Sequence, residues 1–266
     1  MTGRPNPRPS GAATVWRPAL RVLALLGMAG LLVGAAEIPQ QPAPLDAPEA
    51  ARQGRAIVAE LLAQRPVENS TNTGTMRIRA KRKSVYVPVT FIAFPSASGW
   101  INLYAATNAK TAVELTITHE AGGPSQYQLT EKIGESRLQR TLVGDQTMQP
   151  FAGSDFWIAD LGLEFFHWPE QRLVKREMIS SRPCRVIESL NPEPAPGAYS
   201  RVVSWIDDEN GGIIHADAYD FQGKLLKQFN PKGVKKVNGQ WELEGMEILN
   251  RQTDSSTRIE FHLDTK

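Results

Sequence analysis

Cysteine is almost absent from this chain, since Cys184 is the only one among 266 residues. A single cysteine cannot form an intramolecular disulfide, and it excludes zinc sites of the multi-cysteine type. We expect Cys184 to be a small buried side chain in a strand rather than a reactive thiol. No cysteine lies near the N-terminal leader, so the sequence does not predict a lipid anchor.

Catalytic and metal-binding patterns are also missing. The chain has four histidines, and none forms a metal-ligand motif with a neighbour: His119, His167, His215 and His262. There is no nucleophile elbow of the Gly-x-Ser-x-Gly type and no glycine-rich phosphate loop. We therefore expect no catalytic residues, no metal and no cofactor.

Two acidic groups leave narrower alternatives open. Residues 207–209 are Asp-Asp-Glu before Asn-Gly-Gly, which predicts a solvated hairpin loop in preference to a weak calcium site. Glu164 and His167 are spaced to share a helix face, and we expect a polar rim there rather than a metal site. An enzymatic function would gain support only if Asp155, Asp160, Glu164 and His167 converged in one polar pocket.

The N-terminal residues are typical of an export signal. A leader with four arginines and no acidic residue precedes an apolar core at residues 22–33, and Gly34-Ala35-Ala36 follows. The apolar run is too short to span a bilayer comfortably, which favours a signal over an anchor. The sequence predicts a signal peptide at residues 1–36, cleaved near Ala36, and a proline-rich flexible spacer at residues 37–45.

Little net charge remains behind the leader. The whole chain has 30 Lys and Arg against 28 Asp and Glu, and four of these arginines lie in the leader. This balance gives no general attraction to nucleic acid, so none is expected as a partner. One basic cluster stands out, and Arg77, Arg79 and Lys81 are its candidate contacts to lipid headgroups or to an acidic partner. The alternative is a solvated strand face.

The periodicity of the remaining chain predicts one α+β domain over residues 46–266. Asp46 and Glu49 form a capping pattern before the apolar stripe Ile57, Val58, Leu61 and Leu62, and Pro66 ends the predicted helix. Apolar residues then alternate with polar ones in short runs separated by turns. The predicted strands are 76–80, 85–94, 100–106, 113–119, 126–131, 172–179, 184–190, 199–206, 213–221, 225–229, 234–237, 241–249 and 258–263.

So many strands in one meander exceed what an open twisted sheet holds comfortably, so the sheet should curl on itself. We expect a strongly curved antiparallel sheet of about eleven or twelve strands. Asn238-Gly239 predicts a hairpin turn. The apolar parity switches between Leu243 and Met246, which predicts a β-bulge at Gly245.

Aromatic side chains gather between two of the predicted strands. Ser154 is expected to cap a short helix at residues 155–161, which Gly162 would end. The apolar residues in and around this helix are candidates for a ligand cavity or lid: Phe151, Phe156, Trp157, Leu161, Phe165, Phe166 and Trp168. They could equally form a plug that seals the core of the curved sheet, and both interpretations stay open.

The order of these elements carries a resemblance. The series runs from the aromatic cluster through residues 182–188, 199–207 and 219–227 to residues 241–250. It resembles the outer-membrane lipoprotein-sorting proteins, the LolA/LolB-like superfamily, most clearly over residues 140–264. The resemblance implies a periplasmic half-open barrel with helices across its mouth. It also implies an arginine on a strand that holds the lid, for which Arg77 and Arg79 are the nearest candidates by order.

The function that the resemblance implies is non-enzymatic. It is a periplasmic carrier that binds lipoprotein acyl chains or phospholipid during outer-membrane lipoprotein sorting. The alternative is an envelope sensor or protein-interaction domain on the same scaffold, with a membrane-bound partner protein. Lipid that copurifies would indicate a carrier, and a copurifying membrane regulatory protein would indicate a sensor.

Overall fold

The computed structural model describes residues 46–108, 111–120, 123–237 and 240–263, without the side chains of residues 235–242. These residues belong to one compact unit. The expected signal peptide, the spacer at residues 37–45 and the turn at Asn238-Gly239 lie outside the described residues.

Helix α1 (Ala47–Leu62) begins where its capping residue predicts. The Asp46 carboxylate accepts a hydrogen bond from the backbone N–H of Glu49 at 2.8 Å, which satisfies one of the free donors of the first turn. Ile57 and Val58 are buried against the sheet, as the apolar stripe predicts. Gly54 allows a close approach, because a Cβ there would lie 2.6 Å from the Cα of Arg172.

Fifteen strands are present in the described part of the chain. The first six are β1 (Ser70–Ala80), β2 (Lys83–Pro95), β3 (Gly99–Thr107), β4 (Thr111–Glu120), β5 (Gln126–Ile133) and β6 (Ser136–Leu142). The next five are β7 (Glu170–Ile179), β8 (Arg182–Leu190), β9 (Tyr199–Asp207), β10 (Ile213–Asp220) and β11 (Leu225–Pro231). The last four are β12 (Val234–Val237), β13 (Gln240–Leu243), β14 (Gly245–Asn250) and β15 (Ser255–Phe261).

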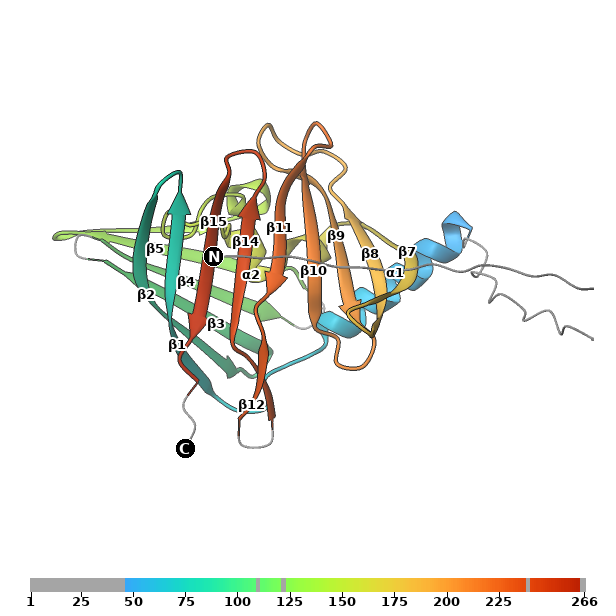
Figure 1. Ribbon diagram of the computed structural model, residues 1–266, viewed down its shortest axis with the longest axis horizontal. Coiled ribbons are helices and arrows are strands. Elements are labelled where there is room, and N and C mark those ends of the chain that lie inside the picture. Colours follow the sequence, from blue (N-terminus) through green and yellow to red (C-terminus); the bar gives the residue numbers. More distant parts are fainter. Residues whose placement is uncertain (1–45, 109–110, 121–122, 238–239, 264–266) are drawn as a thin grey trace, which may run out of the picture. The chain divides into compact units, whose positions relative to one another are not determined.

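Thirteen of these strands form one antiparallel sheet in the order β6-β5-β4-β3-β2-β1-β15-β14-β11-β10-β9-β8-β7. The sheet is curved and is not closed, so β6 and β7 are its edges (Figure 1). The expected eleven or twelve strands therefore become thirteen, with a separate pair of β12 and β13. Strand β6 escaped prediction because its sequence, SRLQRTL, has too few apolar residues to alternate clearly.

The expected β-bulge at Gly245 is wrong. Pro231 lies opposite Met246, and Val234 lies opposite Leu243, so the hairpin keeps one register through this point. Strand β14 also pairs regularly with β15, with Gly245 opposite Glu260. The parity switches because β13 leaves the main sheet and pairs only with β12. Register shifts occur instead in β7, between Leu173 and Lys175, and in β10.

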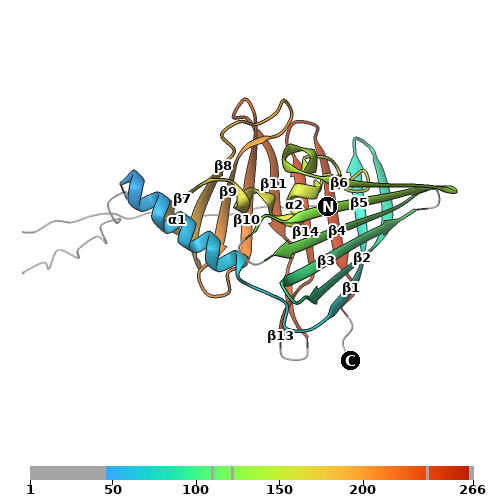
Figure 2. The same ribbon diagram turned by 180° about the vertical axis from the view of Figure 1, so that it is seen from behind.

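The buried apolar residues form two clusters. One lies on strands β1 to β5, β14 and β15, around Met76, Leu115 and Ile259. The other lies on β7 to β10 and includes Ile57 and Val58 of α1. Cys184 is buried in β8, which confirms its predicted place as a small strand residue. Helices α1 and α2 (Ile158–Gly162) lie on the same face of the sheet (Figure 2).

Candidate functional site

One segment connects the two edges of the sheet. Strands β6 and β7 are consecutive in the sequence but lie at opposite ends of the strand order. Residues 143–169, here called the crossing segment, therefore pass across the concave face (Figure 2). They contain η1 (Gly144–Thr147), α2 and η2 (Glu164–His167). The topology thus places a cover over the apolar side of an open sheet.

The predicted aromatic residues all belong to this cover. Phe151, Phe156 and Leu161 are buried in the cluster formed with strands β1 to β5, β14 and β15. Phe165 and Phe166 are buried in the other cluster, where Trp157 and Trp168 pack against it as partly buried residues. The crossing segment therefore contributes to both halves of the core, and its aromatic underside rests on the concave face.

The short helix begins later than expected. Its first residue is Ile158, and Ser154 does not cap it, because the Ser154 hydroxyl donates to the carbonyl of Phe156 within the preceding turn. The carboxylate of Asp160 instead accepts the backbone N–H of Trp157 at 2.7 Å. Gly162 is the last residue of the helix, and the left-handed residue that ends it is Leu163 instead of the predicted Gly162. Gly162 lies close to Tyr127, whose hydroxyl would be 2.3 Å from a Cβ at that position.

Four polar side chains fasten the crossing segment to the sheet, each at a different place. The Asp155 carboxylate accepts hydrogen bonds from Ser255 and Thr257 of β15, at 2.5 and 2.9 Å. Asp160 contacts β9 and β11, Glu164 contacts β5, and His167 contacts Ser125 just before β5. These four residues do not converge in one pocket, so the arrangement that would favour an enzyme is not found among the described residues.

The contact of Asp160 holds a buried lysine. Lys227 of β11 is only 2% exposed, and its Nζ lies 3.4 Å from an Asp160 Oδ. The ammonium also lies over the Trp157 ring, 3.6 Å from its centroid, and the Tyr199 hydroxyl donates to Asp160 at 3.0 Å. Burial lowers the pKa of Lys227 to about 8, and the charge of Asp160 opposes this change. The sheet thus holds α2 through a cation and a carboxylate.

The sequence did not single out Lys227 or Tyr199. A signal was present, since Lys227 has the same strand parity as Phe229, whose side chain packs in the core. A lysine at an inward position of a strand needs a buried partner. Only the fold shows that this partner is Asp160, which lies 67 residues earlier in the chain.

Glu164 makes the contact to β5. The Tyr127 hydroxyl donates to its carboxylate at 2.8 Å. Burial raises the pKa of Glu164, and the hydrogen bond from Tyr127 opposes that rise. The expected polar rim is thus a set of side chains that bridge η2 and the sheet.

A chain of hydrogen bonds continues from η2 to β3. Ser125 Oγ lies 3.2 Å from His167 Nε2 and 2.9 Å from His119 Nδ1. His119 Nε2 in turn lies 3.2 Å from Asn102 Nδ2, and the Trp100 ring stacks on the imidazole at 4.4 Å. Burial lowers the pKa of both histidines, that of His119 to about 4. Both imidazoles are therefore neutral at pH 7. They share hydrogen bonds with Ser125 and do not repel each other as two cations would.

A pocket opens beside this chain of hydrogen bonds. Its volume is about 490 Å³, and it lies between the C-terminal end of α1 and the ends of β3 and β4. Leu62, Trp100 and Phe166 supply apolar walls, and His119 and His167 supply polar ones. A pocket with apolar walls and a few polar groups suits an amphipathic ligand.

The predicted basic residues lie away from the crossing segment. Arg77 and Arg79 are exposed on β1, and Lys81 is in the turn between β1 and β2. Arg79 donates a hydrogen bond to Ser256 at 3.1 Å. No hydrogen bond or ion pair among the described residues joins either arginine to α2, whereas Lys227 contacts Asp160 of α2.

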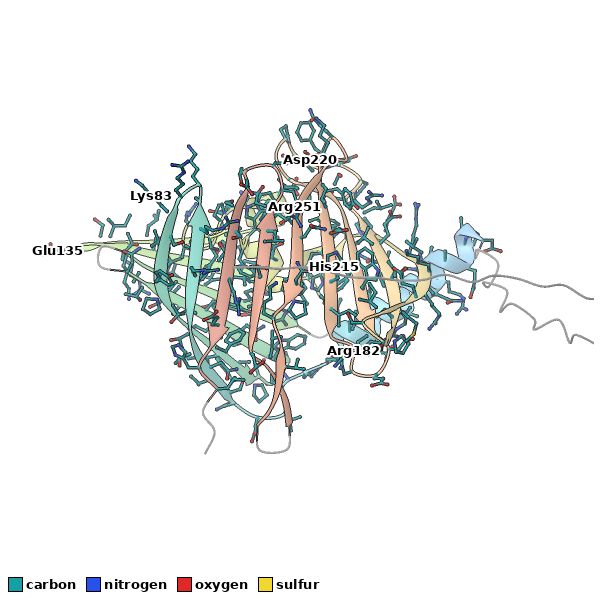
Figure 3. The ribbon with its side chains drawn as sticks, viewed as in Figure 1. Lys83, Glu135, Arg182, His215, Asp220 and Arg251 are labelled. Atoms are coloured by element: carbon teal, nitrogen blue, oxygen red, sulfur yellow. The ribbon has the colours of Figure 1, made fainter. Side chains whose placement is uncertain are left out.

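The acidic loop at residues 207–209 is neutralised by arginines. Arg182 lies 2.6 Å from the buried carboxylate of Asp207, and Arg185 lies 2.7 Å from Asp208 (Figure 3 labels Arg182). In the described part of the chain, no group of three or more His, Cys, Asp or Glu side chains could hold a metal ion. Within the same ranges, no helix has the length and hydropathy needed to span a membrane.

Comparison with known proteins places this fold. A family model with the description "-like: Uncharacterized protein" matches residues 106–264, more than half of the chain. A comparison of this chain with curated proteins finds no match. Among solved structures, a domain from Vibrio parahaemolyticus named as an outer membrane lipoprotein-sorting protein has a TM-score of 0.66 at 20% identity. The match covers 80% of this chain and 91% of that one.

Two further structures agree. A DUF1329 family protein from Desulfovibrio piger has a TM-score of 0.64 at 17% identity, covering 80% of this chain and 91% of that one. A LolA superfamily protein from Nitrosomonas europaea has a TM-score of 0.55 at 14% identity, with the same coverage. At these identities the likeness concerns the fold, and it confirms the resemblance that the order of sequence elements indicated.

Proposed function

The chain belongs to the family whose model spans residues 106–264 and has the fold of the LolA superfamily, and from this premise we propose that it binds acyl chains. The ligand is a phospholipid or the acylated end of a lipoprotein. The proposed setting is the periplasm, during outer-membrane lipoprotein sorting. Binding and release require no catalytic residue and no cofactor.

The crossing segment is the observation that carries this proposal. Its apolar side chains rest on the concave face of an open sheet, while polar contacts at Asp155, Asp160, Glu164 and His167 fasten it. These contacts can break without breaking a strand pair, because the segment adds no strand to the sheet. Its displacement would expose an apolar surface of the kind that an acyl chain covers.

The energies are compatible with exchange. Each acyl methylene that leaves water contributes about 0.8 kcal/mol. A chain of a dozen methylenes would contribute roughly 10 kcal/mol, which is comparable to burying four or five large side chains at about 1.5–3 kcal/mol each. An acyl chain can therefore replace the aromatic underside of the segment at little net cost, and the polar contacts would set the rate of opening.

The test compares Trp157 of the crossing segment with Trp205 of β9. Trp157→Ala removes an aromatic ring from the underside of the segment, whereas Trp205→Ala removes one whose Nε1 donates to Glu177 on the other face. We expect the purified protein to carry lipid or acylated protein, detected by native mass spectrometry and lipid extraction. Trp157→Ala should lower acyl binding several-fold, and Trp205→Ala should not.

Asp substitutions give a harsher version of the same test. Replacing Trp157 or Phe166 with Asp should weaken acyl binding more than it lowers stability if these residues line a lid. Phe166 is only 3% exposed, so its Asp variant places a carboxylate in the core and is the more disruptive of the two. A delipidated protein that binds no acyl chain under any condition would contradict the proposal.

The proposed location has its own test. The basic leader and Gly34-Ala35-Ala36 motivate cleavage after Ala36. N-terminal sequencing of the exported protein should therefore begin at Glu37. A protein retained in the inner membrane with its leader intact would show an anchor instead of a signal.

A second candidate function is an envelope sensor or protein-interaction domain. The outer side of edge strand β6 pairs with no other strand in the described residues, and such an edge can accept a strand from a partner. This function predicts that a membrane regulatory protein copurifies in place of lipid. The same purification therefore decides between the two candidates.

A further inference from the structure

The hairpin of β1 and β2 ends in a run of cations. Residues 79–86, here called the β1–β2 tip, have the sequence Arg-Ala-Lys-Arg-Lys-Ser-Val-Tyr and contain no acidic residue. Ala80 pairs with Lys83, so Lys81 and Arg82 form the two-residue turn, and Lys81 has a φ of 56°. Figure 3 shows Lys83 at the free end of the hairpin.

The cations of the tip are not neutralised by the protein. Among the described residues, Lys81, Arg82 and Lys83 make no ion pair, and Arg79 bonds only to a serine hydroxyl. Four exposed or half-exposed basic residues elsewhere on the sheet do have carboxylate partners: Lys132 with Glu114, Arg140 with Glu131, Arg172 with Glu170 and Lys175 with Glu177. The tip is therefore a local concentration of unpaired positive charge.

Apolar side chains accompany this charge. Val85 has the same strand parity as Val87 and Val89, which are buried, yet it is 55% exposed. Tyr86 lies opposite Arg77 on the outer face and is 63% exposed. The hairpin thus extends past the core, and it presents a valine on one face and a tyrosine on the other to its surroundings.

We propose that the β1–β2 tip docks on the surface of an anionic lipid bilayer. Lys and Arg would contact the lipid phosphates, while Tyr86 and Val85 would enter the interfacial layer, where an amphipathic ring is favoured. A hairpin end is too narrow for the roughly 800 Å² per partner that a stable protein interface buries, which disfavours an acidic protein. Docking goes beyond acyl binding and does not require it.

Vesicle binding tests the proposal. The purified protein is mixed with vesicles of phosphatidylcholine alone or of phosphatidylcholine with phosphatidylglycerol, and the bound fraction is measured by flotation. We expect binding only to the anionic vesicles, and we expect it to weaken as salt is added. At roughly fivefold per cation, the triple variant K81Q/R82Q/K83Q should bind on the order of 100-fold more weakly.

A matched variant separates local charge from net charge. The triple variant R172Q/K175Q/R176Q removes the same number of cations from β7, where each has a carboxylate partner. It should bind anionic vesicles nearly as well as the unchanged protein. Tyr86→Ser should reduce binding several-fold with no change in net charge, which tests the aromatic contribution.

Three results would overturn the proposal. They are equal binding by the two triple variants, equal binding to both kinds of vesicle, and no binding to anionic vesicles at low salt. The last result would leave an acidic protein as the partner of the tip. Acyl content, measured by native mass spectrometry on the K81Q/R82Q/K83Q variant, should stay unchanged. An unchanged protein that binds anionic vesicles but no acyl chain would count against the proposed function alone.

Discussion

At the scale of single residues, the pair of Lys227 and Asp160 shows how a buried charge holds the crossing segment to the sheet. Lys227 comes from the sheet, Asp160 from the crossing segment, and the Trp157 ring covers the ammonium. A buried ion pair adds little net stability, but removing one partner leaves an uncompensated charge. The pair therefore favours the observed position of α2, since any displacement of α2 from the sheet would separate the two charges.

The pKa of Lys227 predicts how stability responds to pH. The amine has a pKa of 10.5 when unfolded and about 8 when folded. Between these values the unfolded chain binds the proton and the folded chain does not, so the free energy of unfolding rises with pH. The slope contributed by one group cannot exceed about 1.4 kcal/mol per pH unit. Lys227→Met should lack this contribution.

Urea unfolding of both proteins over this pH range is the measurement. The stability of the unchanged protein relative to Lys227→Met should increase from about pH 8 upward toward 10.5. Below pH 8, Lys227→Met leaves the Asp160 carboxylate buried without its cation, which should lower the free energy of unfolding. The double variant Lys227→Met/Asp160→Asn removes that carboxylate and should recover part of this loss. A difference between the two proteins that stays constant with pH would show that Lys227 does not titrate there.

At the scale of elements, the hairpin that contains β11 to β14 shows why the alternation of apolar residues alone predicts a bulge wrongly. The apolar pattern around Gly245 predicts a bulge, yet the register is continuous and β13 has left the main sheet. Gly245 is needed for a different reason. A Cβ at this position would lie 2.5 Å from the carbonyl oxygen of Ile259, a backbone atom of the neighbouring strand.

This close approach predicts the effect of a substitution. Gly245→Val should lower the free energy of unfolding by about 1–3 kcal/mol, because β14 must move away from β15 to fit a side chain. Thermal or urea unfolding measures the loss. Glu244→Ala is the control, since Glu244 is exposed and adjacent, and its effect should stay within about 0.5 kcal/mol. Similar losses from both substitutions would contradict the steric explanation.

At the scale of the whole molecule, the open edges of the sheet decide where a cover can lie. The sequence order β6, crossing segment, β7 joins opposite edges, so the connection must traverse the concave face. The same topology divides the core into two clusters, and the crossing segment contributes to each. Ligand entry should therefore depend on movement of the segment relative to the sheet.

A covalent link across this contact tests the requirement for movement. Asp155 and Thr257 touch through two hydrogen bonds, at 2.8 and 2.9 Å, and D155C/T257C would replace them with a disulfide. We expect the oxidised variant to take up several-fold less acyl ligand than its reduced form, measured by fluorescence of a bound fatty-acid probe. The single variants D155C and T257C control for loss of the hydrogen bonds. Equal uptake in both redox states would show that β15 and the segment need not separate.

Local patterns in the sequence determined much of this protein. Asp46 and the apolar stripe located α1, and Cys184 was placed in a strand core. Alternation located twelve of the fifteen strands in the described residues as separate runs, and it located β13 and β14 as one run. These features depend on neighbours within a few residues, so the sequence contains all the information they need. The order of elements even indicated the superfamily fold, which the solved structures share.

Only the tertiary structure decided which distant residues meet. Strand β6 is too polar to recognise in the sequence, and it is held in the sheet by its pairing with β5. Strand β13 lies outside the main sheet because it pairs with β12. The partners of Asp155, Asp160, Glu164 and His167 lie 102, 67, 37 and 42 residues away along the chain. Periodicity records the face on which a side chain lies but not what lies opposite. The aromatic cluster was therefore visible in the sequence, whereas the polar contacts that hold it over the sheet were not.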